Sequence, residues 1–294
     1  MIEPSWTVIL AAGQGRRLAS LTGGIPKQFW RGQGSSSLLD DTLARVAPLA
    51  PLSRTVVIVD QLHRRHVQDH RVSASPATII YQPEDRGTAA GVLLALTPIL
   101  RVNPDALVMI TPSDHGVVDT EGFRAGIREA ARHAVRRAAV VLLGVEPTAA
   151  HRDYGWIMPG PSPDSASLRA VQFFVEKPSA EVASGLWADG AVWNTMVLVA
   201  RASAIRDLCF SLLPQLREVF ETAARLPADE RPGFLNAVYA TLPAFDFSRH
   251  VLTPAPDLWT YVWPASIGWS DLGTPERLAA WHQRAGMSPA MTAA

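Results

Sequence analysis

A glycine-rich segment that carries several cations follows the first apolar run of the chain. The stretch VILAAGQGRRLASLTGGIPKQF, residues 8–29, contains Gly13 and Gly15, an arginine pair that ends at Arg17, and Lys27. Glycine lets backbone N–H groups turn tightly and approach a ligand, while arginine and lysine bind phosphate. The stretch lacks the third glycine of a dinucleotide fingerprint and the Gly-Lys-Ser/Thr ending of a P-loop. We expect several phosphates here; a flexible turn with solvated arginines is the alternative.

Two acidic residues stand where a metal ion could join those phosphates. Asp114 follows the apolar run Ala106–Thr111, and Asp271 precedes a segment with helical spacing. A carboxylate at a strand end can bind Mg²⁺, which prefers oxygen ligands and shares them with substrate phosphates. A helix N-cap or a turn is the structural alternative for each. His115 has no partner at metal-ligand spacing, so we interpret it as a packed side chain.

Two further polar positions accompany apolar strands in the second half of the chain. Lys177 follows Glu176 at the end of one strand, either as a surface ion pair or as a point charge for phosphate. Asn194 stands at the head of another strand, where its amide either caps backbone groups or binds a polyhydroxylated ligand. Sequence spacing leaves both alternatives open.

The first half of the chain alternates between the two periodicities that predict an α/β fold. The apolar runs expected to form buried parallel strands are Thr7–Ala12, Thr55–Asp60, Thr78–Tyr81, Ala106–Thr111 and Ala138–Gly144. The segments with helical spacing are Leu38–Ala47, Gln61–Asp69, Thr88–Leu100 and Glu121–Arg137. This order predicts a doubly wound, mostly parallel sheet, with ligands beyond the carboxyl ends of the strands.

The second half has shorter elements. We expect strands over Gly155–Pro159, Leu168–Val175 and Val192–Ala200, then helical structure over Ala202–Leu242. No linker marks a boundary, so we predict one domain, 1–294. Its expected parts are a first lobe (1–145), a second lobe (146–287) and a frayed tail (288–294), with a cleft between the lobes.

Composition restricts the class of protein. The formal net charge is zero, which argues against nucleic-acid or membrane partners. Cys209 is the only cysteine, so no intramolecular disulfide can form. No run reaches the roughly 18 apolar residues of a membrane span. These features favour a cytoplasmic location.

The order of the motifs resembles that of the sugar-phosphate nucleotidyltransferases, and most of all the mannose-1-phosphate guanylyltransferases. The matching segments are LAAGQGRRL, PKQF, QPEDRGTAA, TPSDH, DYGWI, VEKP, WNT and GWSDLGT, and they extend from about residue 5 to 285. The resemblance implies a Rossmann-like nucleotidyltransferase fold and a Mg²⁺-dependent enzyme. Such an enzyme forms GDP-mannose and pyrophosphate from GTP and mannose 1-phosphate. A homodimer is a candidate assembly.

The resemblance also implies that 1–145 is a nucleotide-binding lobe and 146–287 a sugar-phosphate lobe, and it implies a role for each matching residue. Arg17, Lys27 and Asp114 would be catalytic, with Asp114 and Asp271 as the metal ligands. The nucleotide-binding residues would be Ala11, Ala12, Gly13, Gly15, Gln82, Arg86, Gly87 and Thr88. The sugar-phosphate-binding residues would be Tyr154, Gly155, Glu176, Lys177 and Asn194.

The chain departs from the family pattern on the sugar side. Met196 stands where the family usually has the glycine of Ser-Gly, and strand alternation predicts that it shares a face with Asn194. The family's Glu-Lys pair is missing after Asp246, so a contact to the sugar or the phosphate is either missing or supplied by Arg249 or His250. Another hexose or heptose 1-phosphate, another nucleoside triphosphate, or a non-catalytic sugar-nucleotide binder are the alternative functions.

Overall fold

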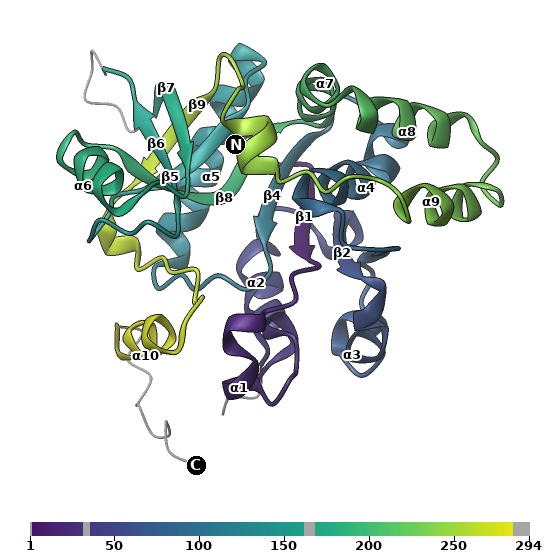
Figure 1. The fold of residues 1–294 in the computed structure, drawn as a ribbon, viewed down its shortest axis with the longest axis horizontal. Helices are drawn as coiled ribbons and strands as arrows, with labels where there is room; N and C mark the ends of the chain where they lie inside the picture. Colours follow the sequence, from purple (N-terminus) through teal and green to yellow (C-terminus); the bar gives the residue numbers. More distant parts are fainter. Residues whose placement is uncertain (1, 32–35, 162–167, 285–294) are drawn as a thin grey trace.

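One nine-stranded sheet forms the centre of the computed structural model, which describes residues 2–31, 36–161 and 168–284 (Figure 1). The strands are β1 (Trp6–Ala11), β2 (Thr55–Asp60), β3 (Thr78–Gln82), β4 (Leu107–Pro112), β5 (Val141–Val145), β6 (Gly155–Pro159), β7 (Leu168–Glu176), β8 (Val192–Arg201) and β9 (Trp259–Trp263). Their order across the sheet is β3-β2-β1-β4-β8-β5-β9-β7-β6, and β6 also pairs with β8.

The pairings give most strands a common direction. Strands β3, β2, β1 and β4 pair in parallel, as do β5 and β9. Strand β8 lies antiparallel between β4 and β5, and β7 lies antiparallel to β9 and β6. Among the described strands, only β7 and β8 therefore run against the rest. The predicted α/β class with a mostly parallel sheet is confirmed.

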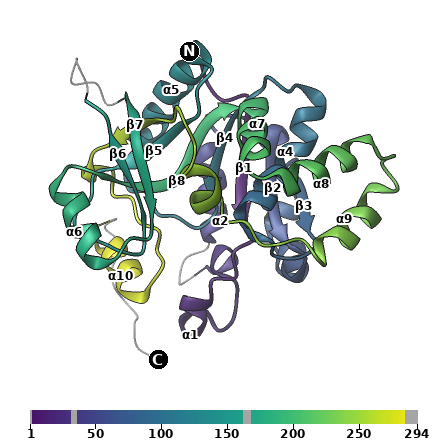
Figure 2. The ribbon, with the colours of Figure 1, turned by 45° about the horizontal axis from the view of Figure 1, so that its top comes forward.

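Helices cover both faces of this sheet. The helices of the described chain are α1 (Ala19–Thr22), α2 (Leu38–Val46), α3 (Arg64–Gln68), α4 (Gly87–Val102), α5 (Thr120–Arg137), α6 (Ala180–Ala188), α7 (Ala202–Leu212), α8 (Pro214–Arg225), α9 (Arg231–Tyr239) and α10 (Pro275–Arg284), of which α1 and α10 lie away from the sheet (Figure 1). Val8 of β1 belongs to the core that includes α4, α7, α8 and α9, and the next residue, Ile9, belongs to the core with α2, α3 and α5. This alternation is why β1 is buried on both faces. Figure 2 shows α4, α7, α8 and α9 gathered beside β1, β2 and β3.

Most expected elements form, with shifted ends. The strand expected to begin at Ala138 begins at Val141, because Ala138 takes a left-handed conformation that ends α5. The helical stretch expected from Ala202 to Leu242 is divided into α7, α8 and α9, and Pro214 begins α8. The sequence patterns did not indicate α6 or β9, whereas the helix expected after Asp271 forms as α10. The tail 288–294 lies outside the described residues.

Within the described residues, no helix combines the length and apolar character needed to cross a membrane.

Candidate active site

The glycine-rich loop follows β1, and the Gln28 side chain holds it in place by hydrogen bonds. The Gln28 amide donates hydrogen bonds to the carbonyl oxygens of Ala11 (2.6 Å) and Gly13 (3.1 Å). Gly15 has a φ of +61°, and a Cβ there would lie 2.9 Å from the Cβ of Lys27. Glycine is therefore required at this position by both backbone conformation and close packing. The loop and the PKQF segment form one unit, in which Gln28 has a positioning role that sequence reasoning missed.

Four separate segments meet at a first cavity of about 350 Å³. Its lining residues are Gln14, Gly15, Arg17, Leu18, Lys27, Asp114, His115, Asp271 and Gly273. They come from the loop after β1, the PKQF segment, the loop after β4 and the segment before α10. The structure thus brings together the residues expected to be catalytic and both carboxylates expected to bind metal. Their chemical roles stay predictions.

Lys27 links the two acidic segments of the first cavity. Its ammonium nitrogen lies 3.2 Å from Oδ2 of Asp114, and it also donates a hydrogen bond to the backbone carbonyl of Asp271. The Lys27 side chain is only 6% exposed, whereas that of Asp114 is 27% exposed. The cation is therefore fixed at the base of the cavity, beside a carboxylate that a ligand can reach.

Asp271 is held by groups from both sides. Its Oδ1 accepts a hydrogen bond from the Tyr154 hydroxyl (2.9 Å), and its Oδ2 lies 3.1 Å from the Arg277 guanidinium. Burial by itself acts to raise the pKa of this carboxyl group. Interactions with His115, Arg277 and Lys27 outweigh burial and hold the pKa below its usual value. Asp271 is therefore a carboxylate at neutral pH, as a metal ligand must be.

The donor set of the first cavity fits Mg²⁺. Asp114 and Asp271 supply carboxylate oxygens, and no group of three or more His, Cys, Asp or Glu suited to a metal occurs in the described part of the chain. Mg²⁺ commonly takes one or two carboxylates and completes its shell with water and substrate phosphates. Burial lowers the pKa of His115 to about 4, so this neighbouring ring is neutral at physiological pH.

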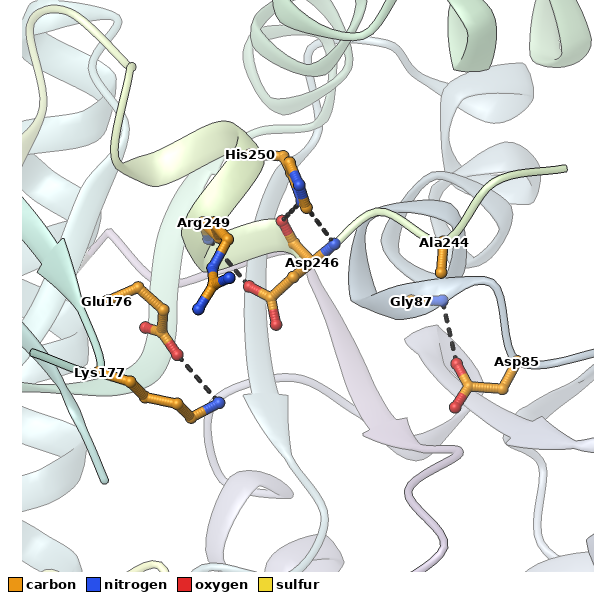
Figure 3. Close-up of a pocket in the computed structure, with 8 residues that line it drawn as sticks. All are labelled: Asp85, Gly87, Glu176, Lys177, Ala244, Asp246, Arg249 and His250. Atoms are coloured by element: carbon orange, nitrogen blue, oxygen red, sulfur yellow. Dashed lines mark hydrogen bonds and ion pairs between the residues drawn. The ribbon is translucent and has the colours of Figure 1, made fainter. Parts of the chain in front are cut away.

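A second cavity, of about 360 Å³, lies between the two halves of the chain (Figure 3). It is lined by Asp85, Gly87, Glu176, Lys177, Ala244, Asp246, Arg249 and His250. Asp85 precedes α4 and Gly87 begins it, whereas Glu176 ends β7 and Lys177 follows it. The other four belong to or precede the π-helical turn η6 (Ser248–Leu252). The cavity therefore joins an expected nucleotide residue, Gly87, with the expected sugar-phosphate residues Glu176 and Lys177.

Contacts around Glu176 define one wall of the second cavity. Glu176 Oε1 lies 3.1 Å from the Lys177 ammonium, and burial raises the pKa of Glu176. A Cβ on Gly155 would lie 2.7 Å from Glu176 Oε2, so the absence of a side chain at Gly155 makes room for this carboxyl group. The Glu176–Lys177 pair therefore lies at the second cavity.

Some of the expected nucleotide residues have structural partners. Arg86 donates to the backbone carbonyls of Tyr239 (2.5 Å) and Ala240 (2.8 Å), which ties α9 to the start of α4. Gln82 is 2% exposed at the end of β3, and the Thr88 hydroxyl accepts a hydrogen bond from the Phe247 N–H. Neither Arg86 nor Gln82 lines the two cavities, so contact of either residue with a base stays a prediction.

The backbone around Met196 is not that of a regular strand. Strand β8 pairs Asn194 with Gly144 and Val197 with Leu143, so β8 bulges between them. Met196 packs against the same core as Val192 and Leu198, and its shared face with Asn194 stays a prediction. Met196 takes a left-handed φ of +57°, and its sulfur accepts a hydrogen bond from Ser248 (3.1 Å). The Asn194 side chain accepts from the Met196 N–H at 3.2 Å. Met196 therefore supports η6, and the bulge explains why glycine suits this position.

Comparisons with known proteins add to this geometry. A family model described as nucleotidyl transferase matches residues 6–286. The chain is 30% identical to the xanthan biosynthesis protein XanB of Xanthomonas campestris pv. campestris, over 91% of this chain and 57% of that protein. It is also 30% identical to the mannose-1-phosphate guanylyltransferase RfbM of Salmonella typhimurium, over 91% of this chain and 56% of that protein.

Solved structures are similar over nearly the whole chain. The crystal structure of mannose-1-phosphate geranyltransferase from Thermus thermophilus aligns with a TM-score of 0.83 at 28% identity, over 94% of this chain and 78% of that one. UDP-glucose pyrophosphorylase complexed with UDP-glucose aligns with a TM-score of 0.62 at 12% identity, over 97% and 98% of the two chains. This second likeness is one of fold alone.

Proposed function

We propose that this chain, which belongs to the nucleotidyl transferase family, forms GDP-mannose and pyrophosphate from GTP and mannose 1-phosphate. Similar proteins named mannose-1-phosphate guanylyltransferases, from Salmonella typhimurium and Escherichia coli K12, support this choice of substrates. The chain spans 57% of the length of XanB and a similar share of these relatives. The activity of the whole protein is therefore part of the proposal.

One observation carries the proposal: the only two lysines of the chain each line one of the two cavities. The sequence has 27 lysine and arginine residues, and all but Lys27 and Lys177 are arginine. Arginine thus provides nearly all of the positive charge. A compact ammonium acts as a point charge for phosphate, which a planar guanidinium does not reproduce. Lysine at these two positions supports a reaction between two phosphate groups.

The proposed reaction is an in-line displacement. A phosphate oxygen of the sugar 1-phosphate attacks the α-phosphorus of GTP, forming one P–O bond while the bond to the β-phosphate oxygen breaks and pyrophosphate leaves. Positioning and charge neutralisation supply most of the catalysis in such reactions. In the proposal, Arg17 and Lys27 offset the charge on the α-phosphate and the leaving group, and Lys177 holds the incoming phosphate.

The carboxylates of the first cavity complete the proposed machinery. Asp114 and Asp271 would hold Mg²⁺, which when bound neutralises phosphate charge and orients the reacting oxygens. Lys27 contacts the side chain of Asp114 and the backbone of Asp271, so it stands beside both proposed ligands. In the proposal, Lys27 adds a second positive charge beside the bound phosphates.

A matrix of nucleoside triphosphates and sugar 1-phosphates, with pyrophosphate release as the readout, tests the function. We expect GTP with mannose 1-phosphate to give the highest kcat/KM. Asp114→Asn and Asp271→Asn should each remove most turnover, because a metal ligand contributes several kcal/mol of charge stabilisation. Asp105→Asn, in the exposed loop before β4, is the matched control. A higher kcat/KM for another pair would replace the proposed substrates, and no release from any pair would indicate a binding protein.

A further inference from the structure

Arg249 presents an unpaired guanidinium to the second cavity. Figure 3 shows it pointing between the carboxylate of Asp246 and the Glu176–Lys177 pair. The Lys177 ammonium already has a partner in Glu176, 3.1 Å away. Among the described residues, the Arg249 guanidinium has no hydrogen-bond or ion-pair partner. The charge of Arg249 acts on Glu176 without a close ion pair, so its N–H donors are available to an anionic ligand.

The backbone that carries Arg249 is fixed on two sides. The N–H of Arg249 donates to Oδ1 of Asp246 (2.9 Å), which stabilises the start of η6. Before this turn, Phe245 exchanges backbone hydrogen bonds with Arg86 (3.0 Å) and Ala89 (2.9 Å). These bonds tie the Arg249 turn to the first residues of α4. These hydrogen bonds therefore fix the backbone position of Arg249 at the edge of the second cavity.

Gly87 makes this close attachment sterically feasible. A Cβ on Gly87 would lie 2.3 Å from the Phe245 carbonyl oxygen, and the φ of Gly87 is +78°. His250, the other cationic candidate on η6, is already used by the fold. Its Nδ1 accepts the Asp246 N–H at 2.9 Å, and its ring packs edge-on against Phe245. The side chain left for a ligand is that of Arg249.

The charges of the second cavity select the kind of anion. Asp85, Glu176 and Asp246 place three carboxyl groups beside the two cations, Lys177 and Arg249. Three carboxyl groups beside only two cations repel a triphosphate, which carries several negative charges. The same carboxylates can accept hydrogen bonds from hydroxyl groups. The two cavities share no lining residue, and the glycine-rich loop belongs to the first. The second cavity therefore fits a hydroxyl-rich molecule with a single phosphate.

We propose that Arg249 and Lys177 together bind the phosphate of the sugar 1-phosphate, and that Arg249 determines the preference for phosphorylated over free sugar. The guanidinium offers paired N–H donors that match phosphate oxygens, and the ammonium adds a point charge from a different element. This inference rests on the proposed function, because that function supplies the sugar 1-phosphate.

Calorimetric titration of the full chain with mannose 1-phosphate, and separately with mannose, tests the assignment. Arg249→Gln should weaken mannose 1-phosphate binding by about ten- to a hundredfold, since it removes a charge-assisted contact. It should leave mannose binding and the KM for GTP unchanged, and Arg249→Lys should recover part of the loss. Arg217→Gln, on the exposed face of α8, is the control. Wild-type affinity in Arg249→Gln, or equal losses for both sugars, would overturn the proposal.

Because the chain has only two lysines, lysine acetylation followed by mass spectrometry locates the phosphate independently. Mannose 1-phosphate should protect Lys177 in the wild type and fail to do so in Arg249→Gln, without protecting Lys27. Protection of Lys27 alone would place the phosphate in the first cavity and overturn the proposal. Binding that depends on Arg249, without pyrophosphate release from any pair, would uphold this site and reject the proposed function.

Discussion

Arg277 forms an ion pair with Asp271, in which a guanidinium nitrogen lies 3.1 Å from Oδ2. Another nitrogen of the same guanidinium lies 2.9 Å from Oδ2 of Asp153. The guanidinium carbon also lies 4.6 Å from the centre of the Tyr154 ring, and Tyr154 bonds the same carboxylate. Arg277 belongs to the first turns of α10. One helix thus fixes the orientation of a proposed metal ligand.

We expect Arg277→Gln to lower the affinity for Mn²⁺, used as a spectroscopic substitute for Mg²⁺, by about ten- to a hundredfold. Loss of a residue that orients a metal ligand typically lowers the metal affinity by about this factor. Electron paramagnetic resonance of free Mn²⁺ gives the affinity without any need for turnover. Arg284→Gln, at the other end of α10, is the matched control. Unchanged Mn²⁺ affinity in Arg277→Gln would show that Arg277 only stabilises the fold.

Lys27→Ala should lower kcat by about a hundredfold or more, and more than it raises the KM for GTP. The reason is that its contact with the leaving group strengthens in the transition state. Steady-state kinetics at saturating mannose 1-phosphate measures both constants, and a thermal melt checks folding, because the variant also leaves Asp114 without its ion pair. A change in KM alone would make Lys27 a binding residue.

Met196→Gly should be more stable to urea than Met196→Ala, by about 1 kcal/mol. Both changes remove the side chain, but only glycine adopts the observed φ of +57° without a steric penalty. Within an ordinary strand the order would be the reverse. The comparison of two unfolding curves cancels the loss of the contact between the methionine sulfur and Ser248. Equal stability, or a more stable alanine variant, would mean that the bulge is not strained.

Cys209 should not react with Ellman's reagent in the native protein at pH 8. Burial raises the pKa of this thiol to about 12, so at pH 8 only about one molecule in ten thousand carries the reactive thiolate. The thiolate fraction rises with pH, yet stays small until pH approaches that pKa. In urea the single thiol should react stoichiometrically, which provides the control. Rapid reaction of the native protein would contradict the burial.

Strand ends explain why much of the site could be predicted. Arg17 and Asp114 follow β1 and β4, and these strands are parallel neighbours in the sheet. Their carboxyl ends therefore meet at one edge, and the side chains that follow them share the first cavity. The apolar runs and the helical spacing were sufficient for that inference because both are local properties of the sequence.

The bulge at Met196 is a detail that local patterns do not indicate. The residues around it alternate as a strand should, but the pairing of β8 with β5 skips residues between Asn194 and Val197. Nothing in the local sequence specifies where a distant partner strand imposes such a bulge. Arg86 is a similar case: besides its neighbour Glu84, it bonds the backbone of Tyr239 and Ala240, more than 150 residues away at the end of α9.

The sequence alone determined the α/β class, and it predicted phosphate binding by the glycine-rich loop and a metal-binding role for the two acids. These follow from periodicity, glycine and charge within short windows. Only the tertiary structure decided that Arg277 holds Asp271, that Gln28 fastens the loop and that Arg249 shares a cavity with Lys177. The physical reason is that such partners are chosen by long-range packing, which brings together residues whose spacing along the chain carries no signal.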